Sequence, residues 1–205
     1  MNKNKTLLFL LVILMNTMMN AQTGTSSPYS RFGLGDLQGN VFPEYDALGD
    51  GVTAISSGNS VNPSNPATYT SFKANSFLFS TGGLHKTTNI QNSTDNQIAN
   101  NSSFSHLVVA FPISRKLGAS AGMLPYSNIG YTLNARDNNA NADMIYSGDG
   151  GLSKIYFGGA YEPLKGFSVG INASYLFGGL NRRKQLVYDD ESFFNSRSNS
   201  KINFT

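Results

Sequence analysis

A regular alternation of apolar and small polar residues marks the segment from Phe167 to Phe177. A period of two predicts a β-strand with one apolar face and one polar face. The apolar positions have aromatic residues near both ends, as in strands of about 9–11 residues that cross an outer membrane. A half-buried strand of a soluble β-sandwich would explain the alternation but not the aromatic ends. The pattern therefore predicts lipid-facing side chains at Phe167, Val169, Ile171, Ala173, Tyr175 and Phe177, and lumen-facing side chains at Ser168, Gly170, Asn172 and Ser174.

Weaker alternation along the rest of the chain predicts further strands, joined by connections of two lengths. The expected strands cover 75–84, 106–113, 117–123 and 154–161, and another begins at about residue 201. Short turns at 114–116 and 162–166 alternate with long polar segments at 85–102, 132–150 and 181–199. Tight turns on one side and long loops on the other are typical of an outer-membrane β-barrel. We therefore predict an all-β fold, an antiparallel transmembrane β-barrel.

About five strands and a stub are too few for such a barrel, because single-chain bacterial barrels begin at about 8 strands. An open sheet edge in lipid would leave backbone N–H and C=O groups without partners. The expected arrangement is therefore the N-terminal part of a longer barrel, in residues 74–205. A barrel pooled from several chains is the alternative.

Residues 22–73 are rich in Gly, Ser, Pro and Asn and show no alternation. Two Asn-Pro steps, at 62–63 and 65–66, hold each Asn in extended backbone. Fifty residues of plain loop are uncommon in a compact domain. We therefore expect this segment to be an N-terminal hatch, or plug, that packs against the barrel.

Residues 1–21 have the three parts of a secretory signal peptide. Lys3 and Lys5 precede the apolar run Thr6–Met15, and Ala21 ends the segment. The apolar run is about 10 residues, too short to span a bilayer as a helix. Cleavage near Ala21 and a location in the bacterial outer membrane are the resulting expectations.

Composition narrows the classes of function. Only 13% of the residues are charged, against about 25% in a typical soluble domain. The formal charge is +3, and removal of Lys3 and Lys5 with the signal peptide would lower it to +1. A nearly neutral chain has no basic footprint for a nucleic acid, so no nucleic-acid partner is expected. The absence of Cys excludes disulfides, a cysteine-ligated zinc ion and a cysteine-linked lipid anchor.

The side chains that could carry chemistry do not form a recognisable set. His85 and His106 are the only histidines, and no nucleophile, base and orienting group can be placed together around them. The segment 137–143 offers oxygen ligands but lacks the central Gly and final Glu of a calcium loop. The basic run 182–184 would meet outer-leaflet anions just past a strand, or form a solvated loop edge. We predict a protein that is not an enzyme, with no cofactor and no metal.

One resemblance suggests a function. Asp46-Ala47-Leu48-Gly49, a following Gly- and Ala-containing stretch, and Asn65-Pro66-Ala67 resemble the N-terminal hatch of the FadL/TodX family of outer-membrane transporters. The resemblance implies that Asn65, Pro66 and Ala67 form a hatch motif. It also implies passive transport of hydrophobic molecules such as fatty acids, with outer-membrane lipid and a hydrophobic small molecule as partners.

The alternative is a barrel of the same kind that does not transport and instead acts in protein secretion or cell-surface assembly, with a secretion-machinery partner. A transporter needs an apolar lumen pocket, whereas a scaffold can be lined by Ser, Asn and Gly. The polar face of 168–174 favours the alternative.

Overall fold

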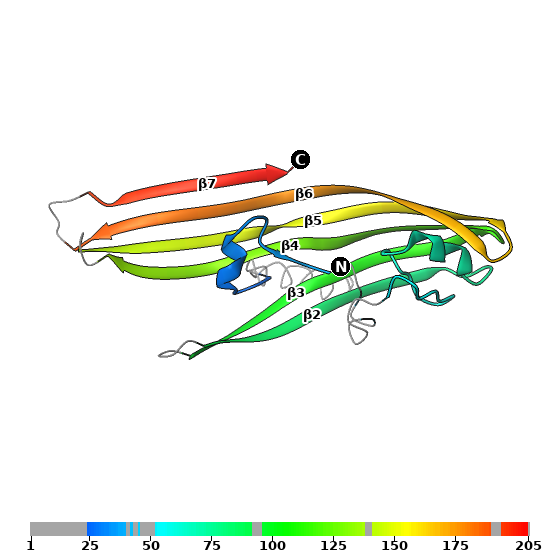
Figure 1. Ribbon diagram of the computed structural model, residues 1–205, viewed down its shortest axis with the longest axis horizontal. Helices are drawn as coiled ribbons and strands as arrows, with labels where there is room; N and C mark the ends of the chain where they lie inside the picture. Colours follow the sequence, from blue (N-terminus) through cyan, green and yellow to red (C-terminus); the bar gives the residue numbers. More distant parts are fainter. Residues whose placement is uncertain are drawn as a thin grey trace, which may run out of the picture.

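The protein is an antiparallel β-sheet protein with very little helix, which confirms the predicted all-β class (Figure 1). The computed structural model describes residues 24–39, 42, 45, 52–91, 96–137, 141–189 and 194–204. The expected signal peptide and the segment 46–49 lie outside these residues. Six strands pair with their neighbours in chain order: β2 (Leu78–Gln91), β3 (Asn96–Ser114), β4 (Leu117–Asp137), β5 (Ala142–Leu164), β6 (Phe167–Tyr188) and β7 (Ser196–Phe204).

The N-terminal part contributes three short elements beside this sheet. They are the 3-10 helices η1 (Pro28–Arg31) and η2 (Pro66–Ser71) and the two-residue strand β1 (Asp36–Leu37), which pairs with β4 as a seventh strand. In Figure 1, η2 lies near the end of the sheet that carries the tight turns, and η1 lies over its middle. No helix among the described residues is long and apolar enough to cross a membrane.

The strands are much longer than expected, and most of the predicted long loops are wrong. Residues 85–91 belong to β2 and residues 96–102 to β3, while 132–137 and 142–150 continue β4 and β5. The basic run 182–184, expected in a loop, lies within β6. Apolar residues in these segments are fewer and are interrupted by Asn, Asp, Gly, Arg and Lys, so their alternation is weak, although Leu133 and Tyr146 still pack against a buried apolar cluster. Cross-strand polar pairs take its place, as where Thr87 Oγ1 donates a 2.9 Å hydrogen bond to Asn100 Oδ1.

The expected count of five strands and a stub is also revised. The stub is a full strand, β7, which begins at Ser196 instead of near 201. The sheet is open, since β2 pairs only with β3 and β7 only with β6 among the described residues. The structure therefore shows a long antiparallel sheet and not a closed barrel.

The sheet divides between β3 and β4. These strands pair only from Leu107–Ser114 to Leu117–Met123, and β4 then continues beside β5 alone on this path. Figure 1 shows β2 and β3 turning away from β4–β6 toward the end opposite η2. The edge of β4 that β3 leaves is met by β1, with Asp36 opposite Asn128 and Leu37 opposite Ser127.

Side-chain and backbone bonds from the N-terminal segment extend this pairing. The Gln38 N–H donates to the Tyr126 carbonyl at 2.9 Å, and the Gly130 N–H donates to Ser30 Oγ at 3.2 Å. Buried backbone groups need such partners, because an unpaired one is costly. The N-terminal segment therefore acts as a partner for the β4 edge. The sequence did not reveal β1, because two residues between turns carry no periodic signal.

Candidate functional site: the plug and its seat on the sheet

Three glycines on adjacent strands form the seat on which η2 lies. A Cβ at Gly118 of β4 would overlap the Tyr69 carbonyl oxygen, and one at Gly158 of β5 would lie 2.8 Å from the Tyr69 ring. A Cβ at Gly170 of β6 would lie 2.5 Å from the Ala67 nitrogen. Only glycine permits this approach of one backbone to another. The described residues before β2 are called the plug from here on, as a name only, and the glycines fix where the plug meets the sheet.

Polar side chains of β6 bind the plug beside this seat. The Tyr69 hydroxyl donates a 3.1 Å hydrogen bond to Asn172 Oδ1, and Asn172 Nδ2 donates to the Pro63 carbonyl at 2.8 Å. The hydroxyls of Thr70 and Ser168 lie 2.8 Å apart. The oxygen and the nitrogen of the Asn172 amide thus each form a hydrogen bond with the N-terminal segment.

Tyr69 is the centre of the plug contact. Its side chain is fully buried, and burial raises the pKa of its hydroxyl, an effect that the bond to Asn172 partly offsets. Nearby, Ser120 Oγ and the Tyr156 hydroxyl lie 2.9 Å apart on β4 and β5. A neutral, hydrogen-bonded tyrosine is the form that a buried site of this kind favours. Tyr69 and this pair of hydroxyls therefore hold η2 on three strands.

The hatch motif starts η2. Asn65 precedes the helix in extended conformation, and its Oδ1 accepts a 3.1 Å hydrogen bond from the Ala67 N–H. Asn65 Nδ2 donates to the Thr53 carbonyl at 2.8 Å, so the same side chain ties η2 to an earlier part of the segment. Pro66 occupies the first helical position, where a missing N–H costs nothing. Asn65, Pro66 and Ala67 therefore shape the plug, and the peptide between Pro66 and Ala67 lies against Gly170.

An apolar core joins the plug to the sheet. From the N-terminal segment it contains Phe42, Tyr45, Val52, Val61, Tyr69 and Phe72, and from the sheet Val108, Ala110, Leu124, Tyr156 and Ala160. Burial of such side chains stabilises the packed state by about 1.5–3 kcal/mol each. The plug is therefore an integral part of the folded unit in its described residues.

The predicted faces of β6 separate as the alternation requires. Ser168 and Asn172 contact the plug through the hydrogen bonds above, Gly170 faces Ala67, and Ser174 is exposed on the same face. On the opposite face Phe167, Val169, Ile171, Ala173 and Tyr175 are exposed, and Phe177 is half-buried. Whether these faces meet lumen and lipid stays a prediction.

The exposed face is apolar across four strands, in three successive rows of opposed residues. The rows are Leu107, Met123, Ile155 and Tyr175; Val109, Ala121, Phe157 and Ala173; and Phe111, Ala119, Gly159 and Ile171. The three rows contain no charged residue, no Ser and no Thr. Ile171 is 75% exposed and Phe157 is 67% exposed. We call these three rows the outer apolar band.

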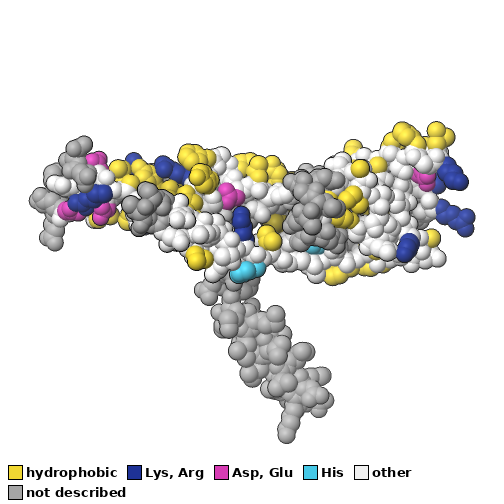
Figure 2. Space-filling model, turned by 60° about the horizontal axis from the view of Figure 1, so that its bottom comes forward, with side chains coloured by type: hydrophobic (Ala, Val, Ile, Leu, Met, Phe, Trp, Pro, Cys, Tyr) yellow, Lys and Arg dark blue, Asp and Glu magenta, His cyan; other side chains and the backbone are white. Residues whose placement is uncertain are grey.

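Charged side chains gather at the two ends of the sheet. Figure 2 shows them at both ends of the long molecule and a few near its middle, with hydrophobic patches between. Arg115, Lys116 and Lys165 are exposed at the tight turns. At the opposite end Arg136 binds both Asp143 and Asp189.

Among the described residues, the hydrogen-bond partners of the two histidine rings are serine hydroxyls and not carboxylates. His106 Nε2 lies 2.8 Å from Ser80 Oγ, its Nδ1 lies 3.1 Å from Ser105 Oγ, and its ring stacks on Phe42 at 4.1 Å between centroids. The hydroxyl of Ser105 thus reaches the ring of its neighbour, although successive strand residues point to opposite faces. His85 Nδ1 lies 2.8 Å from Ser102 Oγ on the exposed surface. These bonds give each ring a structural role.

The expected oxygen-rich loop does not gather its carboxylates. Asp143 is bound by Arg136 Nη1 at 3.0 Å, and residues 138–140 lie outside the described part of the chain. Within that part, no group of three or more His, Cys, Asp or Glu side chains is placed to hold a metal ion.

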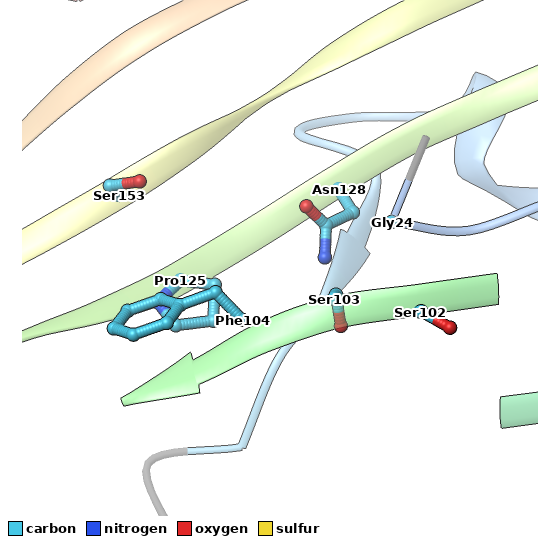
Figure 3. A pocket seen from close by; sticks show the side chains of 7 residues that line it. All are labelled: Gly24, Ser102, Ser103, Phe104, Pro125, Asn128 and Ser153. Carbon is cyan, nitrogen blue, oxygen red and sulfur yellow. The ribbon is translucent and has the colours of Figure 1, made fainter. Parts of the chain in front are cut away.

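A pocket of about 450 Å³ lies where β3 and β4 separate (Figure 3). Its lining is mixed: Gly24, Ser102, Ser103, Phe104, Pro125, Asn128 and Ser153. Ser26 Oγ donates a 2.9 Å hydrogen bond to Asn101 Oδ1 beside it, so the N-terminal segment also contacts β3 here. The pocket is therefore a gap between the plug and two diverging strands.

Comparison with known proteins decides the family. A family model described as BamG matches residues 1–205. The chain belongs to the BamG family. Neither a curated protein nor a solved structure matches the chain. Membership of the BamG family links the chain to the outer membrane and to the BAM assembly machinery.

This finding corrects two expectations. The resemblance to the FadL/TodX family is wrong, because the model that matches the whole chain describes a different family. Transport of hydrophobic molecules, which rested on that resemblance, is wrong with it. Asn65-Pro66-Ala67 misled because Asn before Pro at the start of a helix is a local capping device that unrelated proteins can share.

Proposed function

We propose that this BamG-family chain is a membrane-embedded scaffold in the assembly of outer-membrane proteins. The observation that carries the proposal is the family match over residues 1–205. In this proposal the protein binds partner proteins and outer-membrane lipid, performs no chemical reaction and needs no cofactor. A cleaved signal peptide at residues 1–21 would deliver it through the inner membrane.

The outer apolar band supports the membrane placement. A soluble protein seldom exposes a continuous apolar patch of several strands, because such a patch favours association. The segment Phe167–Phe177 spans about 33 Å along the strand at about 3.3 Å per residue. Tilted at about 45°, it would cover an apolar layer of about 25 Å, the height of the lipid-facing band of outer-membrane barrels. The exposed basic residues at the tight turns would then lie at one interface, and the part of β6 after Phe177 would extend beyond the other.

The open sheet favours a closed barrel in the membrane. Unpaired backbone groups along β2 and β7 would each cost several kcal/mol in hydrocarbon. We propose that both edges pair with further strands, supplied by a longer chain or by other subunits.

The plug face supports a scaffold. Beside η2 it offers Gly118, Gly158, Gly170 and Asn172, all engaged by the plug itself. Hydrogen bonds of the Tyr69 and Asn172 side chains hold the plug against the sheet, as expected of a fixed internal support. Such a support would keep the shape of the outer face and of both ends of the sheet constant, so that a protein partner could bind there.

The test is association in native membranes. A chromosomal epitope tag on the natural protein, followed by mild detergent extraction and affinity purification, should recover the central barrel subunit of the BAM machinery. Depletion of the protein should lower the folded amount of several outer-membrane barrels. Extraction of a tagged protein that is free of the machinery, with normal barrel assembly after depletion, would overturn the proposal.

A further inference from the structure

A second feature of the plug face is a pocket of about 300 Å³ between η1 and the far half of the sheet. Its lining contains four basic side chains and no Asp or Glu among the described residues: Arg31, Tyr131, Tyr146, Arg182, Arg183, Lys184, Ser198 and Ser200. Pairing explains how these residues meet. Tyr146, Lys184 and Ser198 are opposed across β5, β6 and β7, and Arg182 and Ser200 are opposed in the adjacent row.

Two cations share one aromatic ring in this pocket. The Arg31 guanidinium carbon lies 4.3 Å from the centroid of the Tyr146 ring, and Lys184 Nζ lies 5.6 Å from the same centroid. A ring face attracts a cation, but two cations on one ring repel each other. An anion between them would remove that repulsion.

Arg182 adds a third positive charge with unused hydrogen-bonding capacity. Its Nη2 donates to the Gly33 carbonyl, which holds the guanidinium at the turn that follows η1. Its Nε is buried and has no hydrogen-bond partner among the described residues. Arg183 differs, because its Nη2 lies 3.2 Å from Asp149 Oδ1. Arg31, Arg182 and Lys184 therefore form the part of the cluster that has no carboxylate contact in the described structure.

We propose that this pocket binds a phosphate group. A phosphate carries about −1.5 to −2 charges and three strong acceptor oxygens. Arginine binds it through paired N–H donors and lysine as a point charge, and the hydroxyls of Ser198 and Ser200 can donate further bonds. A carboxylate has one charge and two oxygens, so it would satisfy fewer of these donors. The phosphate can belong to a lipid headgroup or be free in solution, since both present the same oxygens.

The test measures binding to the full-length protein in detergent. Inorganic phosphate is titrated by calorimetry in a chloride buffer, and co-sedimentation is measured with phosphatidylcholine vesicles that contain or lack phosphatidic acid. The variants Lys184→Gln and Arg31→Gln remove one cation each. Lys86→Gln, at an exposed position of β2, removes the same charge away from the pocket. Far-UV circular dichroism melts confirm that each variant is folded.

The expected result is saturable phosphate binding, at least tenfold weaker in Lys184→Gln and Arg31→Gln and unchanged in Lys86→Gln. Binding of phosphatidic acid vesicles alone, with the same loss in the two pocket variants, would also support the site and would identify a lipid as the source. Equal affinity in all three variants, or no binding to either probe, would overturn it. The proposed role in assembly is tested separately by co-purification, which neither outcome affects.

Discussion

The Tyr69 hydroxyl donates a hydrogen bond of 3.1 Å to Asn172 Oδ1, across 103 positions of sequence. Tyr69 belongs to the plug and Asn172 to β6, and the Asn172 amide also donates to the Pro63 carbonyl. A single side chain of the sheet thus holds the start of η2 and its buried tyrosine. Loss of either bond would act on the attachment of the plug while the strand pairing stays intact.

Tyr69→Phe should loosen the plug. The variant keeps the ring in the core but leaves Asn172 Oδ1 without its donor, which should lower the free energy of unfolding by about 1–3 kcal/mol. Thermal unfolding and limited proteolysis of the N-terminal segment measure the effect. Tyr29→Phe, at an exposed tyrosine of η1, is the matched control and should change neither. Equal protease resistance of Tyr69→Phe and the natural protein would argue against this attachment.

A disulfide should form between the plug and β6. The hydroxyls of Thr70 and Ser168 lie 2.8 Å apart, so the two side chains point toward each other. A disulfide forms between facing side chains whose Cβ atoms are about 3.8 Å apart. The chain has no natural cysteine, so Thr70→Cys with Ser168→Cys leaves one pairing. Alkylation followed by mass spectrometry should find both thiols oxidised after export. Thr70→Cys with Val169→Cys should remain reduced, because the Val169 side chain points to the face of β6 opposite η2. Oxidation of both pairs alike would contradict the described plug position.

The glycine seat can be tested with one methyl group. Gly118→Ala places a Cβ against the Tyr69 carbonyl, so η2 must shift, and overpacking of this kind costs about 1–3 kcal/mol. Gly159→Ala is the control, because its nearest neighbour would be the Gly118 carbonyl oxygen at 3.8 Å. The melting temperature of Gly118→Ala should be lower than that of the natural protein, and the melting temperature of Gly159→Ala should be unchanged. Similar values for both would show that the plug does not rest on Gly118.

The sequence predicted the strands where the alternation is continuous and missed the parts where Asn, Gly and charged residues interrupt it. The alternation at Phe167–Phe177 placed β6 correctly at its beginning, but β6 continues to Tyr188 through the basic run. Asn-rich segments form strands here because their backbones pair with neighbouring strands. The periodicity within one segment does not reveal such pairing. The seat was missed for a similar reason. Gly118, Gly158 and Gly170 are visible in the sequence, yet only the register of three strands brings them beneath η2.

The far end of the sheet should show a pH-dependent ion pair. Hydrogen bonds from Arg136 lower the pKa of the Asp189 carboxyl, and they outweigh the opposing effect of burial. A folded-state pKa below the unfolded value of about 3.9 gives stability that is present above that value and lost as pH falls through the folded pKa. Arg136→Gln should therefore raise the Asp189 pKa toward 3.9, as measured by carboxyl ¹³C chemical shifts. Lys201→Gln, an exposed substitution in β7, should leave it unchanged.

The membrane-facing assignment has its sharpest test at Ile171, the most exposed large hydrophobic side chain of the outer apolar band at 75%. If this face meets lipid, Ile171→Arg near the midplane should lower the free energy of unfolding in vesicles by about 2–4 kcal/mol. The control is Ser174→Arg, which adds the same side chain on the opposite, exposed face. Asn172→Arg would be a poor control, because it also breaks the bonds to Tyr69 and Pro63. Denaturant titration followed by far-UV circular dichroism measures both variants, since the chain has no tryptophan. A large loss for Ile171→Arg with a small one for Ser174→Arg is expected because only the first guanidinium would be placed in hydrocarbon. Equal losses would mean that the band is covered by protein or water, and the membrane placement would then fail.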